Sequence, residues 1–319
     1  LEFRRVPFRS NAVTKSGTNR YSGNAFEFVR DHNFNAINPF AAIGPDGKRI
    51  DDGLKRNQFG GTVGGPIVRD RIFFFGAFQG TTVRQIPSAN IAYVPTAAML
   101  RGDFTAFTSP ACNQGRQITL RAPFVNNQVS PALFSPAALN LAKRLPSTTD
   151  PCGQGIWGAK TDSNQSQSVG KLDYQLSTNH TVFGRYMYTN VDELPVWNPE
   201  KGDILSSGNA GGDRKVKSHA LTFGDTLVLS SNVVNSLRFA YNRGDLRAER
   251  KPFVDAASLG SKVYTYFPGK ITLSVTGGFN VGQSDSIYSI LTSDSYQVAD
   301  DMTLVKGGHQ LGFGANIAY

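Results

Sequence analysis

The chain has little that would support catalysis, a metal cluster or a helical membrane anchor. Its 319 residues include only 2 cysteines, 3 methionines and 4 histidines. No run of about 18 apolar residues occurs, which excludes a transmembrane helix. The sequence also lacks a G-x-S-x-G elbow, an H-E-x-x-H pair and a P-loop. We therefore expect no enzyme and no cofactor.

The few metal-ligand residue types are poorly placed. The histidines stand apart from one another, and no cysteine or carboxylate lies at a convincing ligand spacing from any of them: His32, His180, His219 and His309. We interpret them as turn or interior side chains. Two pairs of adjacent acids leave Ca²⁺ binding open as an alternative, namely Asp51-Asp52 and Asp300-Asp301.

Positive charge is in excess but is not concentrated. The formal net charge is +9, which is a reason to consider nucleic-acid binding. However, Lys and Arg are scattered along the chain, and no recognition helix or zinc spacing accompanies them. We therefore expect no nucleic-acid partner, and we interpret the charge as solvated and carried largely by loops.

Glycine and phenylalanine are abundant, and many segments alternate between apolar and polar residues. In 58–68, Phe59 and Val63 share one face while Gln58 and Thr62 share the other. In 21–31, the aromatic residues at 26 and 28 share a face with the asparagine at 24. A period of two predicts β-strands with one apolar side.

Short turns and long connections alternate along the chain. Tight turns occur at Arg69-Asp70, 177–179, 231–232 and 306–308, each between two alternating segments. The long segments span roughly 32–56, 84–165, 191–214 and 244–294, and loops this long are uncommon in compact soluble domains. This pattern is typical of outer-membrane barrels, which have short periplasmic turns, long extracellular loops and aromatic girdles. A soluble sandwich or propeller with large insertions is the alternative.

We therefore predict an all-β, antiparallel transmembrane β-barrel. Because the alternation places only about nine or ten strands, we expect an incomplete barrel, an open curved sheet. Lys, Asp and Arg in the polar phase are the candidate lumen-facing residues: Lys171, Asp173, Arg185 and Arg238. The opposite phase should face lipid: Phe74, Leu172, Tyr174, Leu237 (near mid-membrane) and Phe239. Phe73 and Phe75 should point inward.

The longest loop contains both cysteines. Cys112 and Cys152 lie in the segment expected outside the cell, where an oxidising environment favours a disulfide. Between them we expect a short helix with Ser135 as N-cap and Pro136 at its first position. Two unpaired thiols are the alternative.

Several stretches resemble TonB-dependent outer-membrane receptors of the Oar-like type. The run VTKSGTN at 13–19, followed by YSGNAFEF at 21–28, is similar to the junction between plug and first barrel strand in that family. Matching stretches follow in family order: KRNQFGGTVGGPIVRDRIFFF at 55–75, 94–104, 135–146 and 301–314. The resemblance runs from Asn11 to Tyr319. It implies a plug end at 11–20 and the N-terminal part of the barrel at 21–319.

The resemblance also implies a function and partners. Such receptors take up a solute from outside, driven by a TonB-type energy-coupling protein that contacts a segment N-terminal to the plug. We therefore expect outer-membrane lipid, an unidentified extracellular solute and the coupling protein as partners. A surface-structural or adhesive barrel that transports nothing is the alternative. The family's long plug, coupling box and β-sandwich are not seen in this sequence.

The first ten residues differ from the rest. LEFRRVPFRS at 1–10 is, from Glu2 on, one substitution away from the translation of a common sequencing-library adapter. We interpret 1–10 as an adapter-derived artefact and expect the natural chain to continue upstream. A basic membrane-proximal arm is the alternative.

Overall fold

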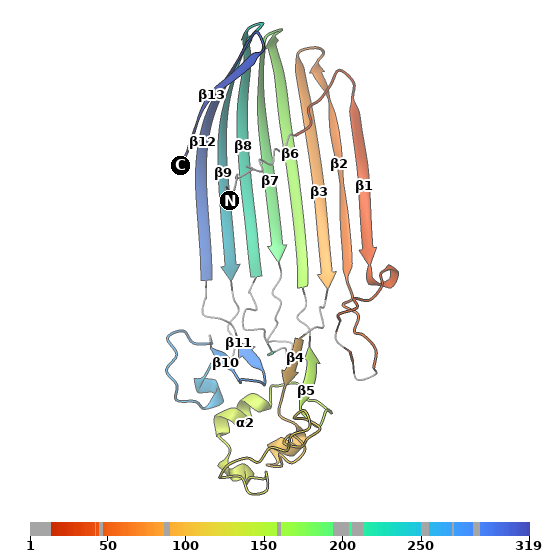
Figure 1. The fold of residues 1–319 in the computed structure, drawn as a ribbon, viewed down its shortest axis with the longest axis vertical. Coiled ribbons are helices and arrows are strands. Elements are labelled where there is room, and N and C mark those ends of the chain that lie inside the picture. Colours follow the sequence, from red (N-terminus) through yellow and green to blue (C-terminus); the bar gives the residue numbers. More distant parts are fainter. Residues whose placement is uncertain are drawn as a thin grey trace.

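A large open β-sheet is the main feature of the computed structural model (Figure 1). The structure describes residues 14–41, 43–44, 47–85, 90–157, 161–193, 204–205, 213–249, 255–269, 271–282 and 288–319. The segment 1–10 and residues 11–13 of the expected plug end lie outside these ranges.

The sheet has nine antiparallel strands in the order β1-β2-β3-β6-β7-β8-β9-β12-β13. Their bounds are β1 Ser22–Asp31, β2 Lys55–Val68, β3 Ile72–Gln85, β6 Thr161–Ser177, β7 His180–Glu193, β8 Asp213–Ser230, β9 Val233–Glu249, β12 Tyr288–Lys306 and β13 His309–Ala318. Among the described residues β1 and β13 form its two edges, so the sheet is open. The predicted all-β antiparallel class is confirmed.

Smaller elements lie in the long connections. They are the strands β4 Asn90–Tyr93, β5 Gln154–Trp157, β10 Thr272–Ser274 and β11 Asn280–Gly282, the α-helices α1 Ala97–Leu100 and α2 Pro136–Ala142, and the 3-10 helices η1 His32–Phe34, η2 Pro131–Leu133 and η4 Ala257–Leu259. The two small sheets, β4-β5 and β10-β11, were not predicted. In the described residues, no helix is both long and apolar enough to cross a bilayer.

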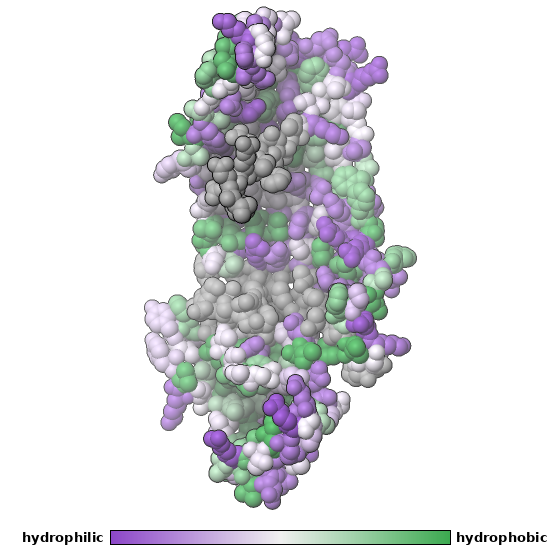
Figure 2. Space-filling view, in the orientation of Figure 1, coloured by the Kyte–Doolittle hydropathy of each residue, from purple (hydrophilic) through white to green (hydrophobic). Residues whose placement is uncertain are grey.

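All short turns lie at one end of the sheet and all long connections at the other (Figure 1). We name these the turn end and the loop end. Figure 2 shows hydrophilic side chains gathered over the turn end. The strands reach further towards the loop end than expected: β12 has 19 residues, whereas about 9–11 suffice to cross a bilayer. Sequence reasoning missed these extensions because most of their residues are polar and their few apolar residues do not alternate regularly.

Cross-strand register separates an apolar face from a polar face. Phe74 is opposite Leu172, and Ile72 is opposite Tyr174, so all four share one face. Phe223 is opposite Phe239, which in turn is opposite Val298, and Leu237 lies on the same face. The residues expected to contact lipid therefore share the apolar face. Phe73 and Phe75 pair with Asp173 and Lys171 on the polar face.

Aromatic side chains mark the loop-end border of the apolar face. Tyr241 and Tyr296 face each other with ring centroids 4.9 Å apart, and Tyr188 lies 5.0 Å from the His219 ring. The Tyr241 hydroxyl donates to Asp294, 2.7 Å away and further towards the loop end. An apolar ring with its polar tip turned from the apolar band is the arrangement of a membrane-interface girdle.

The first strand departs from this division. Phe26 pairs with Gly60, and Phe28 pairs with Gln58, so both rings lie on the polar face. A Cβ at Gly60 would come within 2.8 Å of the Phe26 ring, which shows that the ring covers the glycine. The apolar phase of β1 thus points away from the apolar phase of the other strands. Period-two patterning identifies a strand but does not say which face is buried.

At the loop end, three long connections share one hydrophobic core. We name this unit the loop cap; it comprises the described residues in 90–157, 204–205 and 255–282 (Figure 1). Val281 is fully buried at its centre and forms an isolated bridge with Leu205. Its buried members are Ala92, Val94, Leu141, Ile204, Leu205, Leu259, Phe279 and Val281.

A covalent link and a short helix stiffen the cap. Cys112 and Cys152, the pair expected to bridge, are joined by a disulfide with their Cα atoms 5.3 Å apart. Helix α2 begins at Pro136, with Ser135 at the N-cap position as predicted. The Ser135 side chain makes no capping hydrogen bond, so the fixed φ of proline is what favours this start.

Candidate functional site

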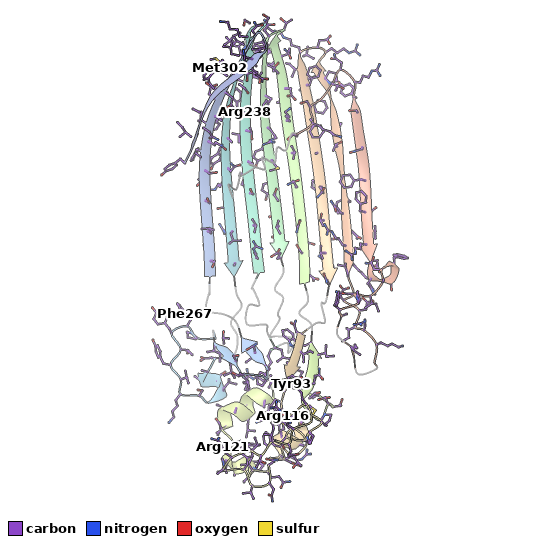
Figure 3. All side chains as sticks on the ribbon, viewed as in Figure 1. Tyr93, Arg116, Arg121, Arg238, Phe267 and Met302 are labelled. Atoms are coloured by element: carbon purple, nitrogen blue, oxygen red, sulfur yellow. A yellow bond between two sulfur atoms is a disulfide. The ribbon has the colours of Figure 1, made fainter. Side chains whose placement is uncertain are left out.

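The four candidate lumen-facing residues lie on the polar face, three of them together. Lys171 is directly opposite Arg185 in the β6–β7 ladder, and Asp173 is two residues from Lys171 along β6. Arg238, labelled in Figure 3, is on β9. It is opposite Gly224 of β8, so it lies two strands away from Arg185 of β7. The structure thus brings Lys171, Asp173 and Arg185 into one cluster, which we name the basic cluster, and leaves Arg238 apart.

An ion pair lies at the centre of the basic cluster. Lys171 Nζ is 2.8 Å from Asp173 Oδ1, and the two side chains are only 10% and 14% exposed. The ammonium also lies 4.9 Å from the centroid of the Phe183 ring. A desolvated ion pair is costly unless its remaining hydrogen-bonding groups find partners, so the surroundings of this pair decide its contribution.

The chain just before β1 supplies some of those partners. Lys171 Nζ donates to Ser16 Oγ at 2.5 Å, and one Arg185 nitrogen donates to Thr14 Oγ1 at 2.9 Å. The other terminal nitrogen of Arg185 donates to Thr222 Oγ1, also at 2.9 Å. Residues 14–20, which we name the docked segment, therefore lie across the polar face near the turn end.

Close backbone packing holds the docked segment. A Cβ at Gly17 would lie 2.4 Å from the Phe74 carbonyl oxygen and 2.7 Å from that of Gly65. Only glycine permits this approach. The Asn19 side chain bonds the turn twice: its amide donates to the Asp70 carboxylate, and its oxygen accepts from the Asp70 backbone N–H at 2.8 Å.

Two polar atoms of the basic cluster make no hydrogen bond within the described residues. Among the described residues, Asp173 Oδ2 and Arg185 Nε are buried without a hydrogen-bond partner. A buried polar atom without a partner costs about 1–3 kcal/mol. The cluster is therefore not fully stabilised by its present contacts and can accept a rearrangement of the docked segment.

The histidines are less isolated than the sequence indicates. His180 Nε2 lies 2.9 Å from Asp225, and His32 Nδ1 lies 2.7 Å from Asp51. His219 Nδ1 lies 2.6 Å from the Tyr186 hydroxyl. Antiparallel register and a loop turn create these neighbours, and sequence spacing gives no sign of them.

The paired acids do not form cation sites. Asp300 and Asp301 are adjacent in β12, so their side chains point to opposite faces. Asp51 is engaged by His32, and Asp52 accepts from Gln85. Within the described ranges, no group of three or more His, Cys, Asp or Glu side chains could hold a metal ion.

The chain was compared with known families, curated proteins and solved structures. No curated protein matches the chain. The similar solved structures include the outer membrane transporter YddB from Escherichia coli, with 12% identity, a TM-score of 0.47, and 94% of this chain and 30% of that chain covered. A mutant ferric enterobactin receptor, PfeA, from Pseudomonas aeruginosa has 10% identity, a TM-score of 0.46, and coverage of 96% and 32%. The chain thus spans about a third of the length of these two proteins.

A third similar structure is the toluene transporter TodX from Pseudomonas putida, with 10% identity, a TM-score of 0.28, and coverage of 94% and 64%. The family model described as outer membrane beta barrel domain matches residues 13–319. That match covers almost the whole chain and agrees with the open antiparallel sheet. The chain therefore belongs to the outer-membrane β-barrel domain family, and its place is the outer membrane of a Gram-negative-type bacterium.

Proposed function

We infer that this chain is part of a TonB-dependent receptor that takes up a solute through the outer membrane. The observation that carries this proposal is the docked segment. It holds the stretch that resembles the junction of plug and barrel, and it contacts the basic cluster on the polar face through Thr14 and Ser16. On this proposal the polar face lines the lumen, the turn end faces the periplasm, and the loop cap faces the outside.

Energy coupling would act by moving the docked segment. The segment is held by side-chain hydrogen bonds to Lys171 and Arg185 and by the Asn19–Asp70 pair. Contacts of this kind are each worth about 1–3 kcal/mol. A pull from the periplasmic side can break such contacts one after another without unfolding the sheet. On this proposal a TonB-type coupling protein supplies the pull, and an extracellular solute passes once the segment has moved.

A locked variant tests this proposal. Ser16→Cys with Lys171→Cys, linked by a reducible bis-methanethiosulfonate reagent that spans the removed lysine side chain, would join the docked segment to β6 covalently. Glu193→Cys with Arg214→Cys, treated with the same reagent, would add a matched crosslink between two strands on the same face. The measurement is the loss of each solute from a defined mixture in the medium, with energised cells that carry each variant and with a deletion strain as the background. We expect the first crosslink to stop removal, reduction to restore it, and the control crosslink to leave it unchanged.

A non-transporting adhesive barrel is the second candidate. Aromatic and apolar side chains of the loop cap lie open to solvent, with Tyr264 83%, Tyr266 75% and Val263 70% exposed. Exposed patches of this kind often mark interaction sites. If cells with the wild-type protein remove no solute beyond the deletion strain but adhere through residues 263–267, the adhesive function holds and uptake does not.

A further inference from the structure

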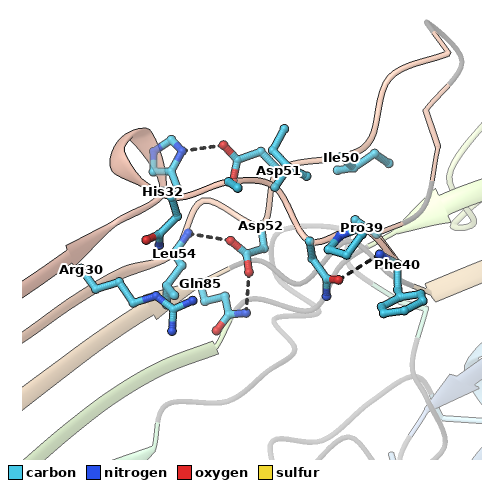
Figure 4. A pocket seen from close by; sticks show the side chains of 14 residues that line it. Arg30, His32, Pro39, Phe40, Ile50, Asp51, Asp52, Leu54 and Gln85 are labelled. Carbon is cyan, nitrogen blue, oxygen red and sulfur yellow. Dashed lines mark hydrogen bonds and ion pairs between the residues drawn. The ribbon is translucent and has the colours of Figure 1, made fainter.

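A pocket at the loop end is separate from the basic cluster. It lies between the end of β1, η1 and the segment leading into β2, with a volume of about 410 Å³ (Figure 4). Polar side chains share the pocket wall with apolar ones. Its apolar wall is formed by Ala36, Ile37, Pro39, Phe40, Ile50 and Leu54.

The acids and the histidine of this pocket are engaged with one another or with the chain. Asp51 accepts from the Gly53 backbone N–H at 3.0 Å and lies 2.7 Å from His32. Asp52 accepts from the Leu54 backbone N–H and from Gln85, each at 3.0 Å. Each carboxylate therefore already has two partners; Figure 4 shows both for Asp52 and the His32 contact for Asp51.

Arg30 is different, because its guanidinium lines the pocket without a partner. Within the part of the chain that the structure describes, Arg30 has no ion pair and no side-chain hydrogen bond. The Asn35 side chain, on the same wall, also makes none. Asn38 uses its oxygen to accept from the Phe40 N–H at 2.9 Å, which leaves its amide N–H groups open. The open groups are thus mainly donors.

A second arginine strengthens the positive potential beside the pocket. Arg56 is directly opposite Arg30 in the β1–β2 ladder, so their side chains lie on the same face. Residues in this position have Cβ atoms about 4.5–5.5 Å apart, and like charges there are destabilising. An anion bound at Arg30 would relieve this repulsion.

We propose that this pocket binds a small organic monoanion, a carboxylate attached to an apolar group. The guanidinium of Arg30 offers a carboxylate two parallel hydrogen bonds. The apolar part would lie on Ile37 and Phe40, which are 46% and 91% exposed. Asp51 and Asp52 disfavour a second negative charge, which selects monoanions over dianions. The site rests on the proposed function in one respect, that the loop end is the side where solutes arrive.

Binding to the protein in isolated outer-membrane vesicles tests the site, with phenylacetate as the probe and saturation-transfer NMR as the measurement. Vesicles from the deletion strain give the background. Arg30→Gln should weaken binding about tenfold or more, as expected for losing hydrogen bonds between charged groups. Arg30→Lys, which keeps the charge without the planar fork, should fall between. Arg247→Gln, a cation of β9 on the apolar face, is the matched control and should bind as wild type.

Comparison probes decide the ligand class. We expect 2-phenylethanol, phenethylammonium and phenylalanine all to bind more weakly than phenylacetate, and Asp52→Asn to bind phenylacetate more tightly. Absence of phenylacetate binding to wild type, equal binding by Arg30→Gln, or tighter binding of phenylalanine would each overturn the proposal. None of these results depends on transport, because the crosslinking experiment with Ser16 and Lys171 tests that separately.

Discussion

Lys171 stands directly opposite Arg185 across β6 and β7, and its ammonium pairs with the carboxylate of Asp173, 2.8 Å from Lys171 Nζ. Lys171 and Arg185 also donate hydrogen bonds to the docked segment, so these three charged side chains connect that segment to the polar face of the sheet. Among the described residues no other acid pairs with Lys171, so the cluster is sensitive to the loss of this carboxylate.

Replacing Asp173 should therefore destabilise the protein. Asp173→Asn leaves Lys171, whose side chain is only 10% exposed, without its counter-charge, and breaking a buried pair costs about 3–5 kcal/mol. A guanidinium titration of the protein in outer-membrane vesicles measures this. The control is Glu193→Gln, which breaks an ion pair whose members are 39% and 54% exposed and should cost less than about 1 kcal/mol. Equal costs would contradict the buried character of the cluster.

The apolar face should reject charge most strongly at the level of Phe239. That residue lies between Phe223 and Val298, so Phe239→Arg should cost about 2–4 kcal/mol. Leu237 is flanked on the same face by Asp225 and Asp300, which places it nearer the turn-end interface than the sequence predicts. Leu237→Arg should therefore cost clearly less. The same titration compares the two, and the reverse order would refute this assignment of depth.

Protease access should report the orientation. Arg116 and Arg121 are exposed in the loop cap (Figure 3), whereas Arg69 and Arg71 flank the first short turn. We expect trypsin added to intact cells to cut after Arg116 or Arg121, and to cut at the turn only once the outer membrane is disrupted. The disulfide should hold the cap fragments together until reduction. Cleavage at the turn first would reverse the proposed orientation.

The disulfide should stabilise the loop cap. Cys112 and Cys152 are separated by 40 residues, for which loop-closure entropy gives about 4 kcal/mol. The double variant Cys112→Ala with Cys152→Ala should make residues 90–157 sensitive to protease while the strands stay protected. Thiol labelling of the unfolded, unreduced wild type should find no free thiol, and labelling after reduction should find both. Two labels without reduction would exclude the bridge.

Acid should loosen the connection between β1 and β2. The Gly53 backbone N–H, and then the His32 side chain, hold the pKa of Asp51 below its ordinary value. A lowered pKa in the folded state means stabilisation that is complete above the ordinary carboxyl pKa of about 4 and is lost as the pH falls through the folded value. Hydrogen exchange at the His32 amide, which donates to the Leu54 carbonyl at 2.7 Å, measures this. In Asp51→Asn the exchange, corrected for intrinsic rates, should change less over that window; the remaining change reports Asp31, whose pKa the Asn33 backbone N–H also lowers.

The alternation in the sequence was sufficient to predict the membrane-level part of the large-sheet strands and the short turns between them, but not the small sheets β4-β5 and β10-β11. Lys171, Asp173 and Leu172 could be assigned to their faces because a strand turns each side chain by half a revolution. The same reasoning could not assign Phe26, because its ring faces a glycine on the neighbouring strand rather than an apolar exterior. The pattern within one strand does not show where the neighbouring strand has a glycine that leaves space for a ring.

Contacts between distant parts of the chain were beyond the sequence. Ser16 and Lys171 are 155 residues apart, and Arg185 and Thr14 are 171 apart. The extensions of the strands beyond the girdle were also missed, because the hydrogen-bonded backbone continues there without a regular alternation of apolar and polar residues. Similarly, the cap core combines short apolar stretches from three connections, none of which is periodic enough to be recognised alone.

The shared core of the loop cap limits how the outer surface can diversify. Val281 lies against residues from two other connections, so a change of length in one of them would disturb the packing of all three. These connections must therefore vary together, as one inherited unit. The connection between β1 and β2 contributes no described residue to that core. It is the part of the rim that can be exchanged between related barrels, or replaced by an engineer, without repacking the remainder.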